Sequence, residues 1–266
     1  MLRIGLNGYG RIGRYFSELA SKTHEIELTI NHIREDPRVS NGKLNIDGYR
    51  INWITSQKDI KFSDIPWSGL DCIIEAAIVA STEQLEDHLK NANYVVMTGT
   101  PKNPVFTYNQ GFNDSFDGSQ KIIGFGDDRA QIAGPLIRVL RDNYCCRKVF
   151  ISTVRPPYTS ESDKRVDTIG DSKRFVQDVE VCEILHFDPN STLCKMILVC
   201  DVECDKEADV IQRVRKRFPS FNVEIIPVEK RYTGRMSFAI EYDPVMPYTK
   251  LLYDFVRKLK PMDKNP

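Results

Sequence analysis

Residues 1–14, MLRIGLNGYGRIGR, constrain the fold more than any other stretch of this chain. Alternating apolar residues predict a short buried strand at Leu2, Ile4 and Leu6. The pattern G-x-G-x-x-G follows at Gly8, Gly10 and Gly13, and apolar residues at helical spacing come next. Strand, glycine turn and helix in this order are typical of a dinucleotide-binding fold.

Each glycine of the turn has its own role in such a fold. Gly8 allows the tight turn, Gly10 lets the backbone approach a pyrophosphate, and Gly13 lets the helix pack against the strand. The helix N-terminus offers free N–H groups and a partial positive charge to an anion. The alternative is a glycine-rich turn that holds no ligand. We expect a site that descends from a nucleotide binder.

Composition excludes some classes of function. The 266 residues are enough for two domains. Lys plus Arg equals Asp plus Glu at 37 each, so nothing favours binding to nucleic acid or to a membrane surface. No apolar run has the length that a bilayer span needs, and the N-terminus does not resemble a signal peptide.

The seven cysteines are irregularly spaced and include no C-x-x-C pattern. Neither a zinc site nor a disulfide framework is therefore expected, and we expect no metal site. Reduced thiols are typical of a cytoplasmic protein.

The order of elements predicts an α/β chain of two kinds of domain. Strands and helices alternate up to about residue 127, which indicates an N-terminal Rossmann-type dinucleotide-binding domain. Ser81 and Gln84 predict a capped helix there, and 41–48 a hairpin-type segment. Strands then outnumber helices, which indicates a reduced α+β catalytic-type domain. We expect the domains at 1–127 with 243–266 and at 128–242, with an exposed loop at 155–174.

The sequence resembles the glyceraldehyde-3-phosphate dehydrogenase family. Ile4 to Arg14 match that family's first strand and glycine turn nearly residue for residue, and shorter matches recur in order along the chain. They lie at Asn41–Leu44, Ile65–Trp67, Pro135–Leu136, Thr153–Val154, Tyr158–Thr159, Tyr242–Asp243 and Tyr248. Two long pieces are missing, between Asn31 and Asn41 and after Asp167. The second is the loop that lines neighbouring subunits' cofactor sites, so a monomer or homodimer is expected rather than the family's tetramer.

The resemblance implies that the reacting groups are replaced. The family's nucleophilic Cys position falls on Asp128, and its general-base His position falls on Arg155. A carboxylate is a poor nucleophile for an aldehyde, and a guanidinium is no base near neutral pH. We expect Asp128 to be a helix N-cap, completed by Gln131, rather than a catalyst. The alternative is a carboxylate that assists another reaction with an unidentified partner.

No other side chain takes over these roles in the sequence. The four histidines lie elsewhere, at His24, His32, His88 and His186. We expect His88 on a helix surface and His186 at the end of a strand, both structural. Cys145 and Cys146 follow a helix instead of starting one, so nothing in the sequence lowers their pKa.

Cofactor positions that the resemblance implies are partly retained. The retained set is the pyrophosphate cradle of Gly8, Gly10, Arg11, Ile12 and Gly13, with Thr98 in place of a Ser near the nicotinamide. The altered set is His32 for the ribose-binding Asp, Ala77–Ile78 for a Thr-Gly, and Pro244 for the Asn that holds the nicotinamide amide. Glu35 and Asp36 are read as surface charge, with ribose binding as the alternative.

An anion site is a further hypothesis. Four residues could form it, or could equally be solvated: Arg129, Arg155, Thr159 and Arg165.

Three functions remain open at this point. The first is a binding or structural pseudoenzyme with NAD or NADP binding weakened or lost. The second is an NAD(P)-dependent aldehyde oxidoreductase using direct hydride transfer, in which His32 and Arg34 would favour a 2′-phosphate. The third is a subunit of a larger assembly that uses the basic residues of a helix, Arg213, Arg215, Lys216 and Arg217, for a protein partner. Ligand classes consistent with these are a nucleotide or a small anion.

Overall fold

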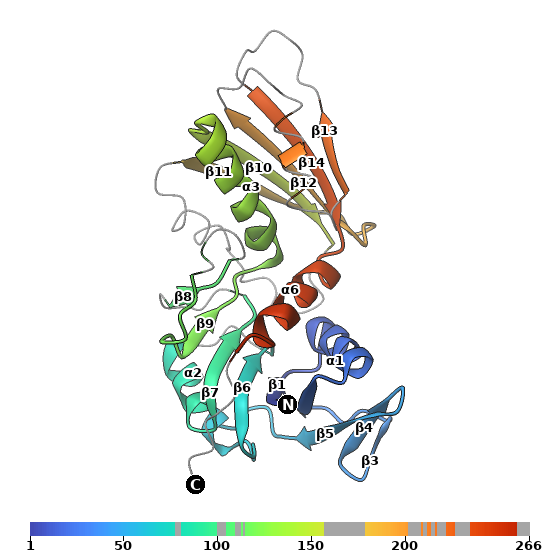
Figure 1. Ribbon diagram of the computed structural model, residues 1–266. Helices are drawn as coiled ribbons and strands as arrows, with labels where there is room; N and C mark the ends of the chain where they lie inside the picture. Colours follow the sequence, from blue (N-terminus) through green and yellow to red (C-terminus); the bar gives the residue numbers. More distant parts are fainter. Residues whose placement is uncertain are drawn as a thin grey trace. The chain divides into compact units, whose positions relative to one another are not determined.

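The computed structural model describes residues 1–77, 81–99, 105–109, 113, 115–156, 179–201, 209, 212–213, 216, 222–226 and 235–259. The chain forms two compact units (Figure 1). Unit 1 comprises Met1–Tyr108, Ser115–Gly126 and Tyr248–Pro266, and unit 2 comprises Asn109–Asp114 and Asp127–Pro247.

Unit 1 is built on a nine-stranded sheet in the order β3-β4-β5-β2-β1-β6-β7-β9-β8. Its strands are β1 (Leu2–Asn7), β2 (Ile26–His32), β3 (Val39–Ser40), β4 (Lys43–Ile46), β5 (Tyr49–Thr55), β6 (Leu70–Glu75), β7 (Ala92–Met97), β8 (Phe106–Thr107) and β9 (Ile122–Gly124). Its helical elements are α1 (Arg11–Thr23), the short η1 (Phe62–Asp64), α2 (Thr82–Leu89) and most of α6 (Met246–Val256). The strands β5, β2, β1, β6, β7, β9 and β8 pair in parallel. The expected Rossmann-type arrangement is confirmed.

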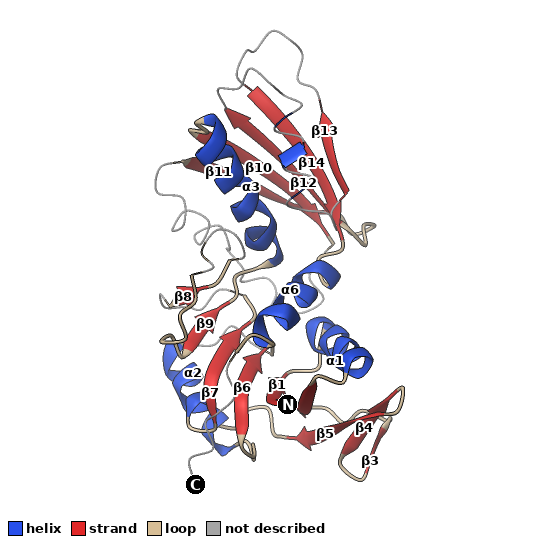
Figure 2. Ribbon diagram, viewed as in Figure 1, coloured by secondary structure: helices blue, strands red, loops and turns tan. Residues whose placement is uncertain are grey.

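Apolar side chains on both sides of the central strands hold unit 1 together. Ile4 and Leu6 of β1 are fully buried, as the alternation predicted. Phe16 of α1 packs edge-on against Tyr253 of α6, with ring centroids 5.2 Å apart. Figure 2 shows α1 and α6 as neighbouring helices of this unit. Helix α6 therefore belongs to the same hydrophobic core as β1 and α1.

The glycine turn has two crowded positions and one open position. Gly8 has φ +105°, and a Cβ there would lie 2.8 Å from the Ala77 nitrogen. A Cβ on Gly13 would lie 2.4 Å from the Gly8 carbonyl oxygen. Gly10 has φ −80°, which any residue adopts, and a Cβ there would meet nothing within 4 Å. Gly8 and Gly13 are thus explained by the fold, whereas Gly10 is not.

Unit 2 packs one long helix on a five-stranded mixed sheet in the order β11-β10-β12-β14-β13. Its described elements are α3 (Asp128–Tyr144), β10 (Lys148–Arg155), β11 (Glu180–Phe187), β12 (Cys194–Asp201), β13 (Asn222–Ile226) and β14 (Arg235–Tyr242). Leu136 and Leu140 of α3 are buried in one cluster with Ile151, Leu198 and Phe238 of the sheet. Figure 2 shows α3 along one face of these strands, which confirms the α+β prediction.

Two predictions made from short sequence motifs are confirmed. Ser81 and Gln84 form the predicted capping box at the start of α2, and the predicted hairpin segment holds β4 with turns on both sides. The expectation for His88 is wrong. Its side chain is fully buried, stacks on Phe62 with ring centroids 4.2 Å apart, and contacts Glu75. The eight-residue helix α2 places His88 toward the sheet, where the buried carboxylate provides a polar partner.

Several expectations lie wholly or partly outside the described residues. These are most of the loop 155–174 and most of the basic helix, including Arg215 and Arg217. Arg213 is described. Its Nε lies 3.2 Å from Asp209 Oδ2 and its guanidinium donates to Asn143 Oδ1 at 2.9 Å, so this side chain is bound within unit 2.

Alanine at the two glycines should therefore have unequal effects on stability. We expect Gly13→Ala to lower the free energy of unfolding by about 1–3 kcal/mol, because the backbone must shift to relieve the contact with Gly8. Gly10→Ala should lower it by less than about 1 kcal/mol, since only the weak N-cap preference of Gly over Ala is lost. Urea unfolding of both variants and the wild type measures this. Equal destabilisation would contradict the crowding at Gly13.

Candidate functional site

The candidate cofactor residues share one edge of the parallel sheet in unit 1. The glycine turn follows β1, Ala77 follows β6, and Thr98 follows β7. The Gly8 N–H donates to the Asn31 carbonyl at 2.9 Å, which ties the turn to the end of β2. Ligands of open α/β sheets bind at this carboxyl edge.

The first turn of α1 carries the features of an anion site. Gly10 is its N-cap, and among the described residues no side-chain hydrogen bond caps the start of this helix. Arg11 is exposed and Ile12 is partly exposed. A Cβ on Gly10 would meet nothing within 4 Å, so the backbone is open there, and helix N–H groups at such a position can bind a phosphate. These residues fit a dinucleotide's pyrophosphate.

At the end of β2, His32 contacts the glycine turn. The Tyr9 N–H donates to His32 Nδ1 at 3.3 Å, and the imidazole packs near the edges of Tyr9 and Trp53. Burial and the charges of Arg34 and Arg14 lower the pKa of His32. The ring is therefore a neutral hydrogen-bonding group rather than a carboxylate substitute.

Asp36 is already bound to another side chain. Its Oδ1 accepts from Arg38 Nε at 2.9 Å and its Oδ2 accepts from the Arg38 guanidinium at 2.7 Å. These bonds lower the pKa of Asp36 to about 2. Ribose binding by Asp36 would compete with this ion pair, whereas Glu35 is exposed.

At the end of β6, the Glu75 side chain is fully buried and hydrogen-bonded. It accepts from Asn7 Nδ2 at 2.6 Å and from the Ala77 N–H at 2.7 Å, and its Oε2 lies 3.0 Å from His88 Nε2. Thr98 donates its hydroxyl to the Glu75 carbonyl at 3.1 Å. The Thr98 oxygen can therefore only accept a further hydrogen bond in this arrangement.

In unit 2 the expectation that Asp128 caps α3 is wrong. The N-cap is Asp127, whose Oδ1 accepts from the Ala130 N–H at 2.8 Å. Because the helix begins at Asp128, its third position is Ala130, so Gln131 cannot complete a capping box. With two consecutive Asp residues, the sequence alone does not distinguish which one caps the helix.

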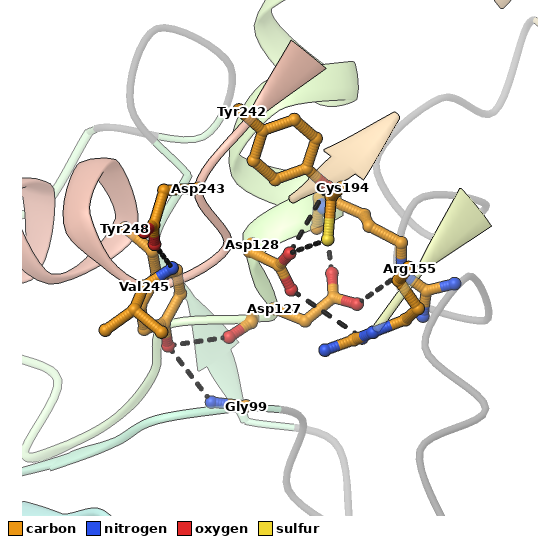
Figure 3. Close-up of polar contacts among 12 residues, drawn as sticks. Gly99, Asp127, Asp128, Arg155, Cys194, Tyr242, Asp243, Val245 and Tyr248 are labelled. Carbon is orange, nitrogen blue, oxygen red and sulfur yellow. Dashed lines mark hydrogen bonds and ion pairs between the residues drawn. The ribbon is translucent and has the colours of Figure 1, made fainter. Parts of the chain in front are cut away.

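Asp128 instead lies in a buried polar cluster (Figure 3). Tyr242 Oη donates to its Oδ2 at 3.2 Å, the Cys194 sulfur lies 4.0 Å from the same oxygen, and an Arg155 guanidinium nitrogen lies 3.9 Å from Oδ1. Burial and the neighbouring Asp127 carboxylate raise the pKa of Asp128, while Arg155 opposes the rise. Burial raises the pKa of Cys194 to about 12.

The sequence did not single out Cys194 or Tyr242 as partners of Asp128. The two residues lie on β12 and β14 and are direct cross-strand partners in the antiparallel register. Their side chains therefore share the face of the sheet on which α3 packs. Predicting this pair would require the pairing register of β12 and β14, which a single sequence does not reveal.

The proposed anion residues are partly brought together. Arg129 is 2% exposed, and its Nε donates to Asp127 Oδ2 at 2.8 Å. Arg155 is also buried, so neither guanidinium is a solvated charge. Thr159 and Arg165 lie outside the described residues.

The remaining cysteines correct one expectation. The six described cysteines are free thiols. A hydrogen bond with the Cys200 thiol lowers the pKa of Cys146, contrary to the sequence-based expectation. Within the described residues no group of three or more His, Cys, Asp or Glu side chains could hold a metal ion. None of the described helices is both long and apolar enough to cross a membrane.

Comparison with known proteins gives one consistent similarity. The chain is 30% identical over 198 residues to glyceraldehyde-3-phosphate dehydrogenase 1 of Schizosaccharomyces pombe, covering 65% of this chain and 56% of that protein. It is 29% identical over 189 residues to the Sordaria macrospora glyceraldehyde-3-phosphate dehydrogenase, covering 63% and 55%. The Danio rerio enzyme is 26% identical over 204 residues, covering 67% and 59%. The chain thus spans little more than half the length of these curated relatives. No protein-family model matches it.

The burial of Asp128 makes a pH-dependent contribution to stability. With a pKa raised above the ordinary 3.8, the folded protein holds more protons on this group than the unfolded chain does, from about pH 4 upward to the folded pKa. The contribution of Asp128 to the free energy of unfolding therefore falls as pH rises through this range. We expect Asp128→Asn to remove that decline, measured by urea unfolding at a series of pH values.

Asp142→Asn is the matched control, because Asp142 lies on the same helix with its side chain 43% exposed. A wild-type pH profile that Asp128→Asn leaves unchanged would contradict the raised pKa.

Proposed function

We propose that this chain, which is similar to glyceraldehyde-3-phosphate dehydrogenases over little more than half of their length, is a divergent member of that family and a nucleotide-binding pseudoenzyme. It retains the pyrophosphate cradle and binds an NAD-type dinucleotide more weakly than an intact cofactor site would. It does not carry out the phosphorylating dehydrogenase reaction. The observation that carries the proposal is the buried pair of Asp128 and Arg155 at the family's nucleophile and base positions.

The chemistry of this pair supports loss of the reaction. A thiolate must add to the aldehyde to form a thiohemiacetal that can release hydride, and a carboxylate does this poorly. Arg155 stays charged near neutral pH and takes no proton from a reacting group. The pair therefore supplies no thiol nucleophile, and Arg155 supplies no base.

The neighbouring thiol does not restore the missing nucleophile. Cys194 is close to Asp128, but the thiolate is the reactive form and burial raises the pKa of Cys194 to about 12. The adjacent negative charge of Asp128 adds to this effect. Cys194 therefore stays protonated near neutral pH.

The turn in unit 1 supports retained binding. Helix N–H groups without a side-chain cap and open space at Gly10 suit a pyrophosphate, which Gly8, Gly10, Arg11, Ile12 and Gly13 would hold. A bound nicotinamide dinucleotide would supply hydride chemistry, with Thr98 at that end of the sheet edge. Pro244 offers no side-chain hydrogen bond to the amide, which favours weakened binding.

The setting that we propose is the cytoplasm, where free thiols such as the six described here stay reduced. We propose a monomer or homodimer that can bind a protein partner. Neither nucleic acid nor a membrane is a proposed partner, because the chain carries no excess of positive charge.

Two measurements on the purified protein test the proposal. With NAD, phosphate and glyceraldehyde-3-phosphate, absorbance should detect no more NADH than with the Asp128→Ala variant. Calorimetry should detect binding of NAD or NADP, with Gly10→Asp lowering the affinity about tenfold or more, or about 1.4 kcal/mol. Asp is a favourable N-cap, so Gly10→Asp should not lower the free energy of unfolding.

Asn45→Asp is the matched control for the added charge. Asn45 is exposed on β4, and its side-chain oxygen already accepts a hydrogen bond from the Gly48 N–H, which Asp can preserve. Turnover by the wild type above the Asp128→Ala background would favour an active aldehyde oxidoreductase instead. No binding of either dinucleotide would overturn the nucleotide-binding role.

A further inference from the structure

Four arginines lie in the glycine turn's helix and in the segment after β2. Arg11 and Arg14 lie in the first turns of α1, and Arg34 and Arg38 lie in the segment after β2. All four are exposed. The two segments that carry them, 8–14 and 31–38, contain only Glu35 and Asp36 as acidic residues. These two segments together therefore carry an excess of positive charge.

Contacts and electrostatics bring these arginines to one place. Arg38 donates to Tyr9 Oη at 3.4 Å, and its guanidinium carbon lies 5.9 Å from the centre of the Tyr9 ring. The Arg14 charge acts on Tyr9, His32 and Asp36, and the Arg34 charge acts on His32. Arg38 thus contacts Tyr9 directly, and the charges of Arg14 and Arg34 are near enough to act on the Tyr9–His32 pair.

The residue at the end of β2 is not the carboxylate that would bind a free ribose diol. His32 stands at the end of β2, where an acidic residue would bind the 2′-hydroxyl of NAD. Asp36 is bound to Arg38 by two side-chain hydrogen bonds. Among the described residues Glu35 makes no ion pair, and it lies between Arg34 and the Asp36–Arg38 pair in sequence.

His32 presents a donor rather than an acceptor. Its Nδ1 accepts the Tyr9 N–H, so the proton of the neutral ring lies on Nε2. An N–H donor and guanidinium groups are complementary to phosphate oxygens, and arginine binds phosphate by paired hydrogen bonds. A ribose diol offers no such charge.

We propose that this arginine cluster, Arg14, Arg34 and Arg38 around His32, binds the 2′-phosphate of an NADP-type dinucleotide. The inference rests on the proposed nucleotide-binding function of the glycine turn and names its ligand. The pyrophosphate would occupy the space at Gly10, and the added phosphate would lie at the arginine cluster, one ribose away. In dinucleotide folds an arginine near this position accommodates the 2′-phosphate. The preference is therefore for NADP over NAD.

Calorimetry with NAD and NADP at fixed ionic strength tests this proposal, with 5′-AMP and 2′,5′-ADP as the matched smaller pair. We expect the 2′-phosphorylated ligand of each pair to bind about tenfold tighter. The difference should shrink as salt is added, because exposed charges are screened. This binding readout does not depend on catalytic activity.

Arg34→Ala, alone and with Arg14→Ala, assigns the preference to the cluster. Arg34 makes no ion pair among the described residues, so its removal should leave folding intact. We expect these variants to lose affinity for NADP but not for NAD. Arg50→Ala is the control, because Arg50 is an exposed arginine on β5, opposite Asn45 of the β4–β5 hairpin.

Each outcome decides one point. NAD binding as tightly as NADP would overturn the 2′-phosphate site and leave nucleotide binding standing. An NADP preference that Arg34→Ala and the double variant reduce no more than Arg50→Ala would overturn the arginine assignment. Absence of binding by both dinucleotides would overturn the proposed function, and this inference with it.

Discussion

The close contact between Gly13 and the Gly8 carbonyl determines how the first helix meets the first strand. A side chain at Gly13 would overlap that oxygen at 2.4 Å, so only glycine lets α1 begin where it does. The turn is then tied to β2 through the Gly8 N–H, and its open side is left at Gly10. The position of the helix N-terminus at the sheet edge follows from this one approach. Everything that we assign to ligand binding in unit 1 depends on it.

In unit 2, hydrogen bonds and an ion pair offset part of the cost of burying polar side chains. Asp128 loses hydration on burial and regains part of the loss from Tyr242 and Arg155. Such a buried pair is weak evidence for stability, since burying charge offsets much of the attraction. Partners from β10, β12 and β14 hold the Asp128 carboxyl group in one place within the unit.

The sequence predicted features that depend on nearby residues. The buried strand at Leu2–Asn7, the glycine turn and the Ser81 cap all follow from residues a few positions apart. It could not predict features that depend on pairing across the chain. His88 is buried because Glu75 lies below it, and Cys194 meets Tyr242 because of strand register. The choice between Asp127 and Asp128 as the cap was a local error, and the burial of Asp128 behind it required the tertiary structure.

The buried Glu75 has a consequence for motion at the nucleotide edge. One carboxylate accepts from a residue of β1, from the backbone after β6 and from a side chain of α2. If any of these segments separates, the charge loses a partner in a site that water does not reach, so the remaining bonds no longer offset its burial. Partial opening is thus unfavourable compared with both the closed state and full local unfolding. Hydrogen exchange along this edge should be cooperative, with these three segments protected together as one unit.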